Sequence, residues 1–385
     1  MKIGLVLSKV PAPSETFFIS KVKGLQKAGH QVILFANGHL KNKICKSIRH
    51  PVSSYSSFAL IVLSILASIK LFLIRPFVVL KFIKLESNDG RTFFQCMKNI
   101  YLNNHILVSK MDWIHFGFMT FAINRQNLAR AINAKMGVSL RGYDICVYPL
   151  KHPMCYSNVW GKVDKVHAIS HDLLKVSEKL GFSKKNRFQI IKPAIDLEFF
   201  RNEKIYFEKK DKINFLTVGR LHWKKGIEDT IHALSLIRDN GILFNYKIVG
   251  EGPELERLIY ATYDLKLEDY INFVGKVPHE ETKNFYKEAD IYLQYSVQEG
   301  YCNSTIEARS MGLIPIVSNA EGLLENVGNN KLVVEKRNPE KLAEKIVDVI
   351  NNLEKYDKLL KNSYYRIYDE NNINYQIEQF LNFYD

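Results

Sequence analysis

Two glutamates stand eight residues apart, Glu299 and Glu307, and their types and spacing could do chemistry. Glu299 precedes Gly300 in a short loop, and Ser304-x-x-Glu307 has the pattern of a capping box, which predicts a helix starting at Asn303 or Ser304. A loop that leads into a helix offers free backbone N–H groups and a positive dipole end, which suit a phosphate. The two carboxylates could accept hydrogen bonds from the hydroxyls of a sugar and of a ribose.

Each glutamate also has a structural interpretation. Glu307 could serve only to cap its own helix, and Glu299 could be a solvated loop residue. The helix is predicted to end at Gly312, since glycine suits the position just after a helix. The apolar run from Leu313 to Val317 then predicts a buried strand.

Two basic residues, Arg220 and Lys225, lie further upstream, between a predicted strand and a predicted helix. The apolar strand Phe215–Val218 ends at Gly219-Arg220, and Lys225 follows just before an amphipathic helical segment. Ligands gather at the carboxyl ends of strands in open α/β sheets. Fixed cations placed there suit an anionic ligand. The alternative is that Arg220 and Lys225 are solvated surface charges.

Short apolar segments alternate with helical ones through this half of the chain. Strands are predicted over residues 246–249, 271–275 and 290–295, and the first residues of the chain, Met1–Ser8, predict another. This alternation is typical of a doubly wound parallel sheet in an α/β protein. A length of 385 residues allows two domains of ordinary size.

In their order along the chain, these motifs resemble those of the retaining glycosyltransferases of family four, which have the GT-B fold. The motifs are Gly219-Arg220 with Lys225-Gly226, Gly250-Glu251-Gly252, Phe273-Val274-Gly275 and the Glu299/Glu307 pair. Weaker matches in the N-terminal half resemble members that build exopolysaccharide, capsule or lipopolysaccharide; they are Pro13–Phe17, Trp113–Gly117 and Gly142–Ile145. The resemblance covers nearly the whole chain and implies two Rossmann-like domains facing across a cleft.

The resemblance also implies a role for each motif in binding a nucleotide-sugar. Arg220 and Lys225 would hold the donor diphosphate, while Glu307 would bind the ribose and Glu299 the sugar ring. The remaining contacts would come from the backbone of Gly300, Tyr301, Cys302 and Asn303 for the sugar and phosphate, from Lys276 and Val277 for the base, and from Ser14, Glu15 and Thr16 for an acceptor loop.

The chain departs from the family pattern at Arg141, where many relatives have a histidine. Arginine stays protonated and cannot act as a general base, although it could bind a phosphate of a lipid-linked acceptor. Arg141, Glu299 and His115 are the expected catalytic residues; a lone histidine at a strand end also has a structural interpretation. The change at Arg141 leaves open a non-catalytic relative that binds a saccharide or a partner enzyme at a membrane.

The charge of the chain is distributed unevenly. Residues 1–210 hold 33 Lys/Arg against 12 Asp/Glu, whereas residues 211–385 hold 21 against 28. Between Thr16 and Leu85 there are 11 Lys/Arg and no acidic residue. This asymmetry predicts an anionic partner for the N-terminal half. Nucleic acid is not expected, because the chain has no zinc-finger spacing, RNP pattern or helix-turn-helix signature.

The segment Phe58–Lys84 is strongly apolar but is interrupted by Lys70, Arg75 and Pro76. Its longest uncharged run is shorter than the ~20 residues needed to span a bilayer. A pair of helices lying in the headgroup layer of an anionic membrane is the preferred interpretation, with Pro76 as the break. The alternatives are a buried core helix with incidental lysines and a transmembrane helix.

Several classes of protein lack support in the sequence. There is no Asp-x-Asp motif, no zinc spacing, no dinucleotide fingerprint after a strand and no P-loop, so no cofactor or metal is expected. Five cysteines without a C-x-x-C pair fit a reducing compartment. We therefore expect a cytoplasmic enzyme, peripheral on the inner face of the cytoplasmic membrane.

The sequence predicts three regions. Residues 1–200 would form a basic, membrane-facing domain that binds the acceptor, and residues 201–365 would bind the nucleotide-sugar. By resemblance, residues 366–385 would cross back to the first domain as a terminal helix. The expected reaction is metal-independent transfer of a sugar, from a UDP-sugar above all, to a lipid-linked or polysaccharide acceptor. Besides the non-catalytic relative, a sugar phosphorylase or epimerase with the same fold remains an alternative.

Overall fold

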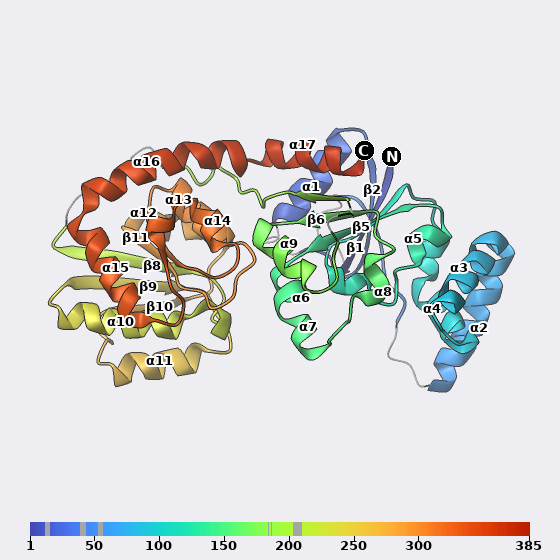
Figure 1. The fold of residues 1–385 in the computed structure, drawn as a ribbon, viewed down its shortest axis with the longest axis horizontal. Coiled ribbons are helices and arrows are strands. Elements are labelled where there is room, and N and C mark those ends of the chain that lie inside the picture. Colours follow the sequence, from blue (N-terminus) through green and yellow to red (C-terminus); the bar gives the residue numbers. More distant parts are fainter. Residues whose placement is uncertain (12–15, 39–43, 53–56, 184, 186, 203–209) are drawn as a thin grey trace. The chain divides into compact units, whose positions relative to one another are not determined.

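The computed structural model describes residues 1–385 apart from 12–15, 39–43, 53–56, 184, 186 and 203–209 (Figure 1). The chain forms two compact units, and each has its own parallel sheet. The first unit contains Met1–Ile191 together with Ile377–Asp385, and the second contains Lys192–Gln376. The fold class predicted from the sequence, α/β with two Rossmann-like parallel-sheet domains, is confirmed.

The first unit is built on a seven-stranded sheet in the order β3-β2-β1-β4-β5-β6-β7. Its inner strands are apolar runs that are buried on both faces, as parallel sheets require. The strands are β1 (Lys2–Lys9), β2 (Gln31–Asn37), β3 (Lys46–Ile48), β4 (Trp113–Phe116), β5 (Lys135–Leu140), β6 (Lys165–Ala168) and β7 (Arg187–Ile190).

The helices of the first unit differ greatly in length. The longer ones are α1 (Thr16–Lys27), α2 (Ser57–Ile74), α3 (Pro76–Asn88), α4 (Phe93–Leu107) and α9 (His171–Glu178). The short ones are η1 (Met119–Ala122), α5 (Leu128–Ala131), α6 (Gly142–Cys146), α7 (Tyr148–Lys151) and α8 (Ser157–Trp160). Among the described residues, no helix combines the length and apolar character needed to cross a bilayer.

Helices α2, α3 and α4 pack against one another beside the sheet of this unit (Figure 1). The break that the sequence predicts is present, because α2 ends at Ile74 and α3 begins with Pro76 as its first residue. Helix α4 begins with a capping box, in which Thr92 Oγ1 accepts from the Gln95 N–H and Gln95 Oε1 accepts from the Thr92 N–H. The alternative of a buried core helix is wrong for α2, because most of its large apolar side chains are exposed.

The second unit has a six-stranded sheet in the order β10-β9-β8-β11-β12-β13. The strands predicted around residues 215, 246, 271, 291 and 314 are all present. The strands are β8 (Lys212–Val218), β9 (Leu243–Val249), β10 (Ile271–Gly275), β11 (Ile291–Gln294), β12 (Ile314–Ser318) and β13 (Val333–Val334).

The helices of the second unit connect these strands and follow them to the end of the chain. They are η2 (Trp223–Lys225), α10 (Ile227–Asp239), α11 (Leu255–Asp264), η3 (His279–Glu281), α12 (Thr282–Glu288), α13 (Asn303–Ser310), α14 (Leu323–Val327), η4 (Asn330–Leu332), α15 (Pro339–Asn351), α16 (Leu353–Glu370) and the start of α17 (Ile373–Tyr384). Helix α15 opens with Pro339, and Asn338 Oδ1 caps it by accepting from the Lys341 N–H at 3.1 Å.

Helix α17 covers most of the predicted terminal helix of residues 366–385, whose first residues belong to α16, and its last part belongs to the first unit. Phe380, Phe383 and Tyr384 are buried in the core of that unit together with strand residues of β1 and β2. The indole Nε1–H of Trp113 donates to the Tyr384 carbonyl oxygen at 2.9 Å. The C-terminal residues are thus part of the first hydrophobic core.

Candidate active site

The site in the second unit begins where β8 and β9 end side by side. The backbone N–H of Gly219 donates to the Val249 carbonyl at 2.9 Å, and the N–H of Leu221 donates to the Glu251 carbonyl at 2.9 Å. Gly250 has a φ of +148°, and a Cβ there would overlap the carbonyl oxygen of Gly219. The two glycine motifs singled out in the sequence therefore hold one loop against the other.

These paired loops present Arg220 at the surface and Lys225 beneath it. Lys225 Nζ lies 2.5 Å from Glu299 Oε2, and only 16 % and 18 % of the two side chains are exposed. Burial by itself would lower the pKa of Lys225, but the electrostatic effects of Cys302 and Glu299 outweigh it and raise that pKa above its usual value. Lys225 is therefore a stable cation, held by the carboxylate that the sequence assigned to the sugar.

Helix α13 begins at Asn303, as predicted, but the predicted capping box is wrong. The N-cap residue is Cys302, and no side chain caps the helix. Ser304 Oγ instead hydrogen-bonds the hydroxyl of Tyr292 at 2.8 Å and lies 3.2 Å from Cys302 Sγ. The S/T-x-x-E pattern failed because both of its side chains have partners on other elements of the unit.

The loop before α13 is held by α14. The backbone N–H of Cys302 donates to Asn326 Oδ1 at 2.9 Å, and Asn326 Nδ2 donates to the Cys302 carbonyl at 3.3 Å. A Cβ at Gly322 would overlap the Gly300 carbonyl oxygen. Tyr301 points into the unit, where its hydroxyl accepts from Asn371 Nδ2 at 2.8 Å, and burial raises its pKa above the usual range. The Tyr301 side chain is therefore occupied inside the unit, and its predicted backbone contact with the donor stays a prediction.

Glu307 is nearly buried and has two partners that the sequence analysis missed. Its Oε1 lies 2.9 Å from His279 Nε2, and its Oε2 accepts from the Tyr286 hydroxyl at 2.9 Å. The hydrogen bond with Glu307 raises the pKa of His279, while burial opposes this increase.

The two predicted base-binding residues differ in exposure. Lys276 is exposed, and its Nζ lies 2.9 Å from Glu251 Oε1. Val277 beside it is half-buried.

The carboxyl ends of neighbouring parallel strands thus bring the predicted donor-site residues together. Arg220 and Lys225 follow β8, Lys276 follows β10, and Glu299 follows β11. His279 could have been found from its place just after the predicted base-binding residues. Asn326 and Tyr286 gave no local signal in the sequence. Asn326 contacts Cys302 and Tyr286 contacts Glu307, and each pair is more than twenty positions apart in the chain.

His115 lies in the first unit, and its environment favours the structural interpretation. It is fully buried, with Nε2 at 2.8 Å from Ser139 Oγ and Nδ1 at 2.8 Å from the Tyr384 hydroxyl. Ser139 Oγ also lies 2.8 Å from His167 Nδ1. Burial, and then the charge of Lys21, lowers the pKa of His115 well below its usual value. With both ring nitrogens occupied, His115 in this structure holds the C-terminal residues rather than facing a substrate.

Arg141 is half-buried at the start of α6, next to three aromatic rings. Its guanidinium lies 4.4 Å from the ring centre of Phe17 and 5.2 Å from that of Phe118, and Nε donates to the Gly117 carbonyl at 3.1 Å. Such contacts hold an arginine in place and keep its charge. Of the predicted acceptor loop, Ser14 and Glu15 lie outside the described residues, and Thr16 is the first residue of α1.

The buried Asp144 close to Arg141 should make the stability of the protein depend on pH. Its Oδ2 accepts from the Met119 N–H at 3.0 Å and its Oδ1 from the Thr120 hydroxyl at 3.2 Å. Burial raises the pKa of Asp144 from 3.8 to about 7, against the lowering effects of Met119, Arg141 and Thr120. Because the folded state keeps the proton, the stabilisation is complete below the unfolded pKa and is lost as the pH rises through about 7.

Asp144→Asn should remove this loss. Between pH 5 and pH 8 the wild type should lose on the order of 2 kcal/mol more stability than the variant, as measured by urea-induced unfolding. Asp172→Asn, a change on α9 of the same unit, should keep the wild-type pH dependence. Equal slopes for the wild type and Asp144→Asn would show that Asp144 is ionised throughout.

Known proteins resemble this chain both in sequence and in fold. Residues 198–366 match the family described as "Glycosyl transferases group 1". The amylovoran biosynthesis glycosyltransferase AmsK of Erwinia amylovora is 25 % identical over 353 residues, which cover 86 % of this chain and 85 % of the relative. A sucrose-phosphate synthase from Thermosynechococcus elongatus superimposes with a TM-score of 0.74 at 17 % identity, over 100 % and 98 % of the two chains.

A further solved structure is HepE of Anabaena, determined with UDP and glucose. It has a TM-score of 0.70 at 16 % identity, and the match covers 99 % of both chains. These likenesses show the fold, which is that of the GT-B glycosyltransferases. The match of residues 198–366 to the group 1 glycosyltransferases agrees with the family that the motifs resembled.

Proposed function

We propose that this protein is a retaining glycosyltransferase that takes a sugar from a UDP-sugar. The observation that carries the proposal is the meeting of Arg220, Lys225, Glu299 and the N-terminus of α13 at one edge of a parallel sheet. Cations and free backbone N–H groups suit a diphosphate, and carboxylates suit sugar hydroxyls. The solved structure of HepE with UDP and glucose supports this choice of donor.

In the proposed reaction the leaving diphosphate gains negative charge as the sugar–phosphate bond breaks. Arg220 and the permanently charged Lys225 would stabilise it, and this needs no metal ion. Glu299 would then exchange part of its contact with Lys225 for hydroxyls of the sugar. Glu307 keeps lone pairs beyond those used by His279 and Tyr286, so it could accept from a ribose as well. The acceptor would attack the sugar on the face from which the diphosphate leaves. The sugar would therefore retain its configuration in the product.

The proposed acceptor is a lipid-linked or polysaccharide saccharide of the cell surface, and the place of reaction is the inner face of the cytoplasmic membrane. The relative named for amylovoran biosynthesis supports a surface glycan as product. The excess of Lys/Arg in residues 1–210 supports an anionic surface as partner. Arg141, fixed by its aromatic neighbours, could bind an acceptor phosphate.

Thermal unfolding with UDP, GDP, ADP and CMP tests the donor site. UDP at about 100 times its Kd should stabilise the protein by roughly 2.7 kcal/mol, a shift of a few degrees in Tm. Arg220→Ala should abolish the shift because the change removes an exposed phosphate ligand without disturbing the core. Arg187→Ala, an exposed arginine of the first unit, should leave the shift intact. A folded wild type that responds to none of the four nucleotides would favour a non-catalytic relative.

A further inference from the structure

Helices α2 and α3 form a hairpin on which many large apolar side chains are exposed. The described residues contain 28 exposed large apolar side chains, and 13 of these lie between Phe58 and Phe94. Eight of the nine on α2 recur at helical spacing, at 58, 61, 62, 65, 66, 69, 72 and 73, and so form one stripe along the helix; Ile74 lies beside this stripe. Leu73 and Phe77, on either side of the turn, are 78 % and 85 % exposed.

The inner side of α2 has the opposite character. Ser64 and Ser68 are buried there, where they donate to the carbonyls of Leu60 and Ser64 at 2.5 and 2.7 Å. A helix of a water-soluble surface buries its apolar stripe and exposes its hydroxyls. Helix α2 instead exposes an apolar stripe and buries two hydroxyls on the side where Leu71 is buried, so the stripe suits an apolar surrounding.

The charges on the hairpin favour an anionic surrounding. Lys70, Lys81 and Lys84 are exposed, and no acidic residue occurs between Thr16 and Leu85. Glu86, at the end of α3, is buried and held by Asn99, Asn127 and Arg91. Two copies of this face would bring like charges together. A lipid layer with an apolar interior and an anionic surface matches both the exposed apolar stripe and the exposed lysines.

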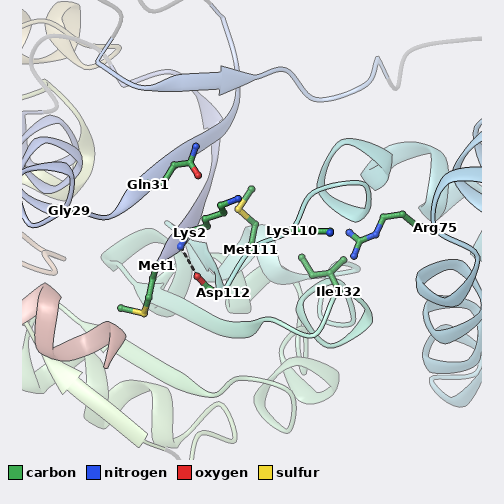
Figure 2. A pocket seen from close by; sticks show the side chains of 9 residues that line it. All are labelled: Met1, Lys2, Gly29, Gln31, Arg75, Lys110, Met111, Asp112 and Ile132. Atoms are coloured by element: carbon green, nitrogen blue, oxygen red, sulfur yellow. Dashed lines mark hydrogen bonds between the residues drawn. The ribbon is translucent and has the colours of Figure 1, made fainter.

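A basic pocket lies at the turn of the hairpin. It has a volume of about 650 Å³ and is open to solvent; Lys2, Arg75 and Lys110 line it with a single carboxylate, Asp112 (Figure 2). Arg75 is fixed there, because its guanidinium donates to the carbonyls of Leu107 and Ser109 at 3.1 and 2.6 Å. Arg75 is also the residue between α2 and α3, so it links the pocket to the turn of the hairpin.

We propose that the α2–α3 hairpin binds one leaflet of an anionic phospholipid bilayer, with its outer stripe among the acyl chains and a lipid phosphate in the pocket of Lys2, Arg75 and Lys110. The inference deepens the membrane location proposed above. It does not depend on the donor site, which lies in the other unit. Basic residues at the border of an apolar stripe add affinity for anionic lipids.

Sedimentation with vesicles tests the proposal. The full chain should bind vesicles of phosphatidylglycerol and phosphatidylcholine and bind pure phosphatidylcholine more weakly. The triple variant Leu66→Gln, Leu73→Gln and Phe77→Gln should lower the affinity about a hundredfold or more, since three large apolar groups leave the lipid. The changed side chains are exposed, so the fold should persist. The matched control is Ile259→Gln, Tyr260→Gln and Tyr263→Gln, three exposed residues of α11, and should bind as the wild type does.

The pocket and the depth of insertion have separate readouts. Lys2→Gln with Lys110→Gln should weaken binding to anionic vesicles by about fivefold for each lysine and leave binding to neutral vesicles unchanged. Fluorescence of Phe77→Trp should be quenched by lipids brominated in the acyl chains, whereas that of Tyr260→Trp should not.

Two results would overturn the proposal. One is unchanged vesicle binding by the hairpin variant. The other is a wild-type dimer in solution that the hairpin variant converts to a monomer, because the face would then belong to a second copy. The nucleotide-dependent Tm shift, measured on the same samples, reports the proposed function independently, so a failure of one proposal can be told from a failure of the other.

Discussion

Replacement of Lys225 by methionine should lower kcat/KM for sugar transfer by about a hundredfold to a thousandfold. Methionine keeps the length of the side chain but removes the charge that is held against Glu299 at 2.5 Å. The leaving diphosphate would lose a fixed cation, and one such group in an active site is worth this much in rate. The assay is the transfer of a radiolabelled sugar from the nucleotide that stabilises the wild type.

The same change should also lower the Tm, because Glu299 would be left as a mostly buried carboxylate without its partner. Adding Glu299→Gln should restore the Tm but not the activity, which separates the chemical role from the structural one. Lys341→Met is the matched control, since Lys341 also pairs with a glutamate but both side chains are more than half exposed. Full activity of Lys225→Met would place the diphosphate elsewhere.

Gly250→Ala should destabilise the second unit by about 3 kcal/mol or more. The new Cβ would overlap the carbonyl oxygen of Gly219, a backbone atom that cannot turn aside, and a φ of +148° is itself strained for alanine. Relief requires the loop that presents Arg220 to move. Any folded fraction should therefore also lose the Tm shift with nucleotide.

Gly241→Ala separates the overlap of the new Cβ with a neighbouring backbone atom from the strain of a positive φ. Gly241 also has a positive φ, of +76°, but a Cβ there would meet nothing within 4 Å. That change should cost only about 1 kcal/mol and leave the nucleotide response unchanged. The measurement is urea-induced unfolding of the second unit for both variants. If the two alanines had equal effects, the contact between the loops would not matter.

Local patterns were sufficient to predict most strands of the second unit. Buried strands of a parallel sheet are apolar runs, and the helix over Ile373–Tyr384 repeats its apolar residues at helical spacing. The alternation of apolar and helical segments also predicted that Arg220 and Lys225 follow the carboxyl end of a strand. These are properties of a few consecutive residues, so they are visible without the fold.

The contacts of the site could not be predicted in this way. Ser304 and Glu307 fit a capping box, yet Tyr292, Tyr286 and His279 provide stronger partners from other elements. His115 stands at a strand end, where ligands often bind, but the C-terminal Tyr384 fills the space in front of it. In each case the decisive partner comes from a distant part of the chain. For Phe58–Lys84 the sequence favoured helices lying on a membrane but left a buried core helix open, because periodicity shows that a helix has an apolar side but not which way that side faces.

The burial of Tyr384 also bears on how the chain is made. The first unit is discontinuous, since residues 192–376 are inserted between its body and its last segment, Ile377–Asp385. A ribosome therefore delivers the whole second unit before the residues that complete the first core. Until Phe380, Phe383 and Tyr384 emerge, the space beside His115 and Trp113 has no side chain to fill it. The half of the protein that is synthesised first can consequently finish folding only after the second unit has been synthesised.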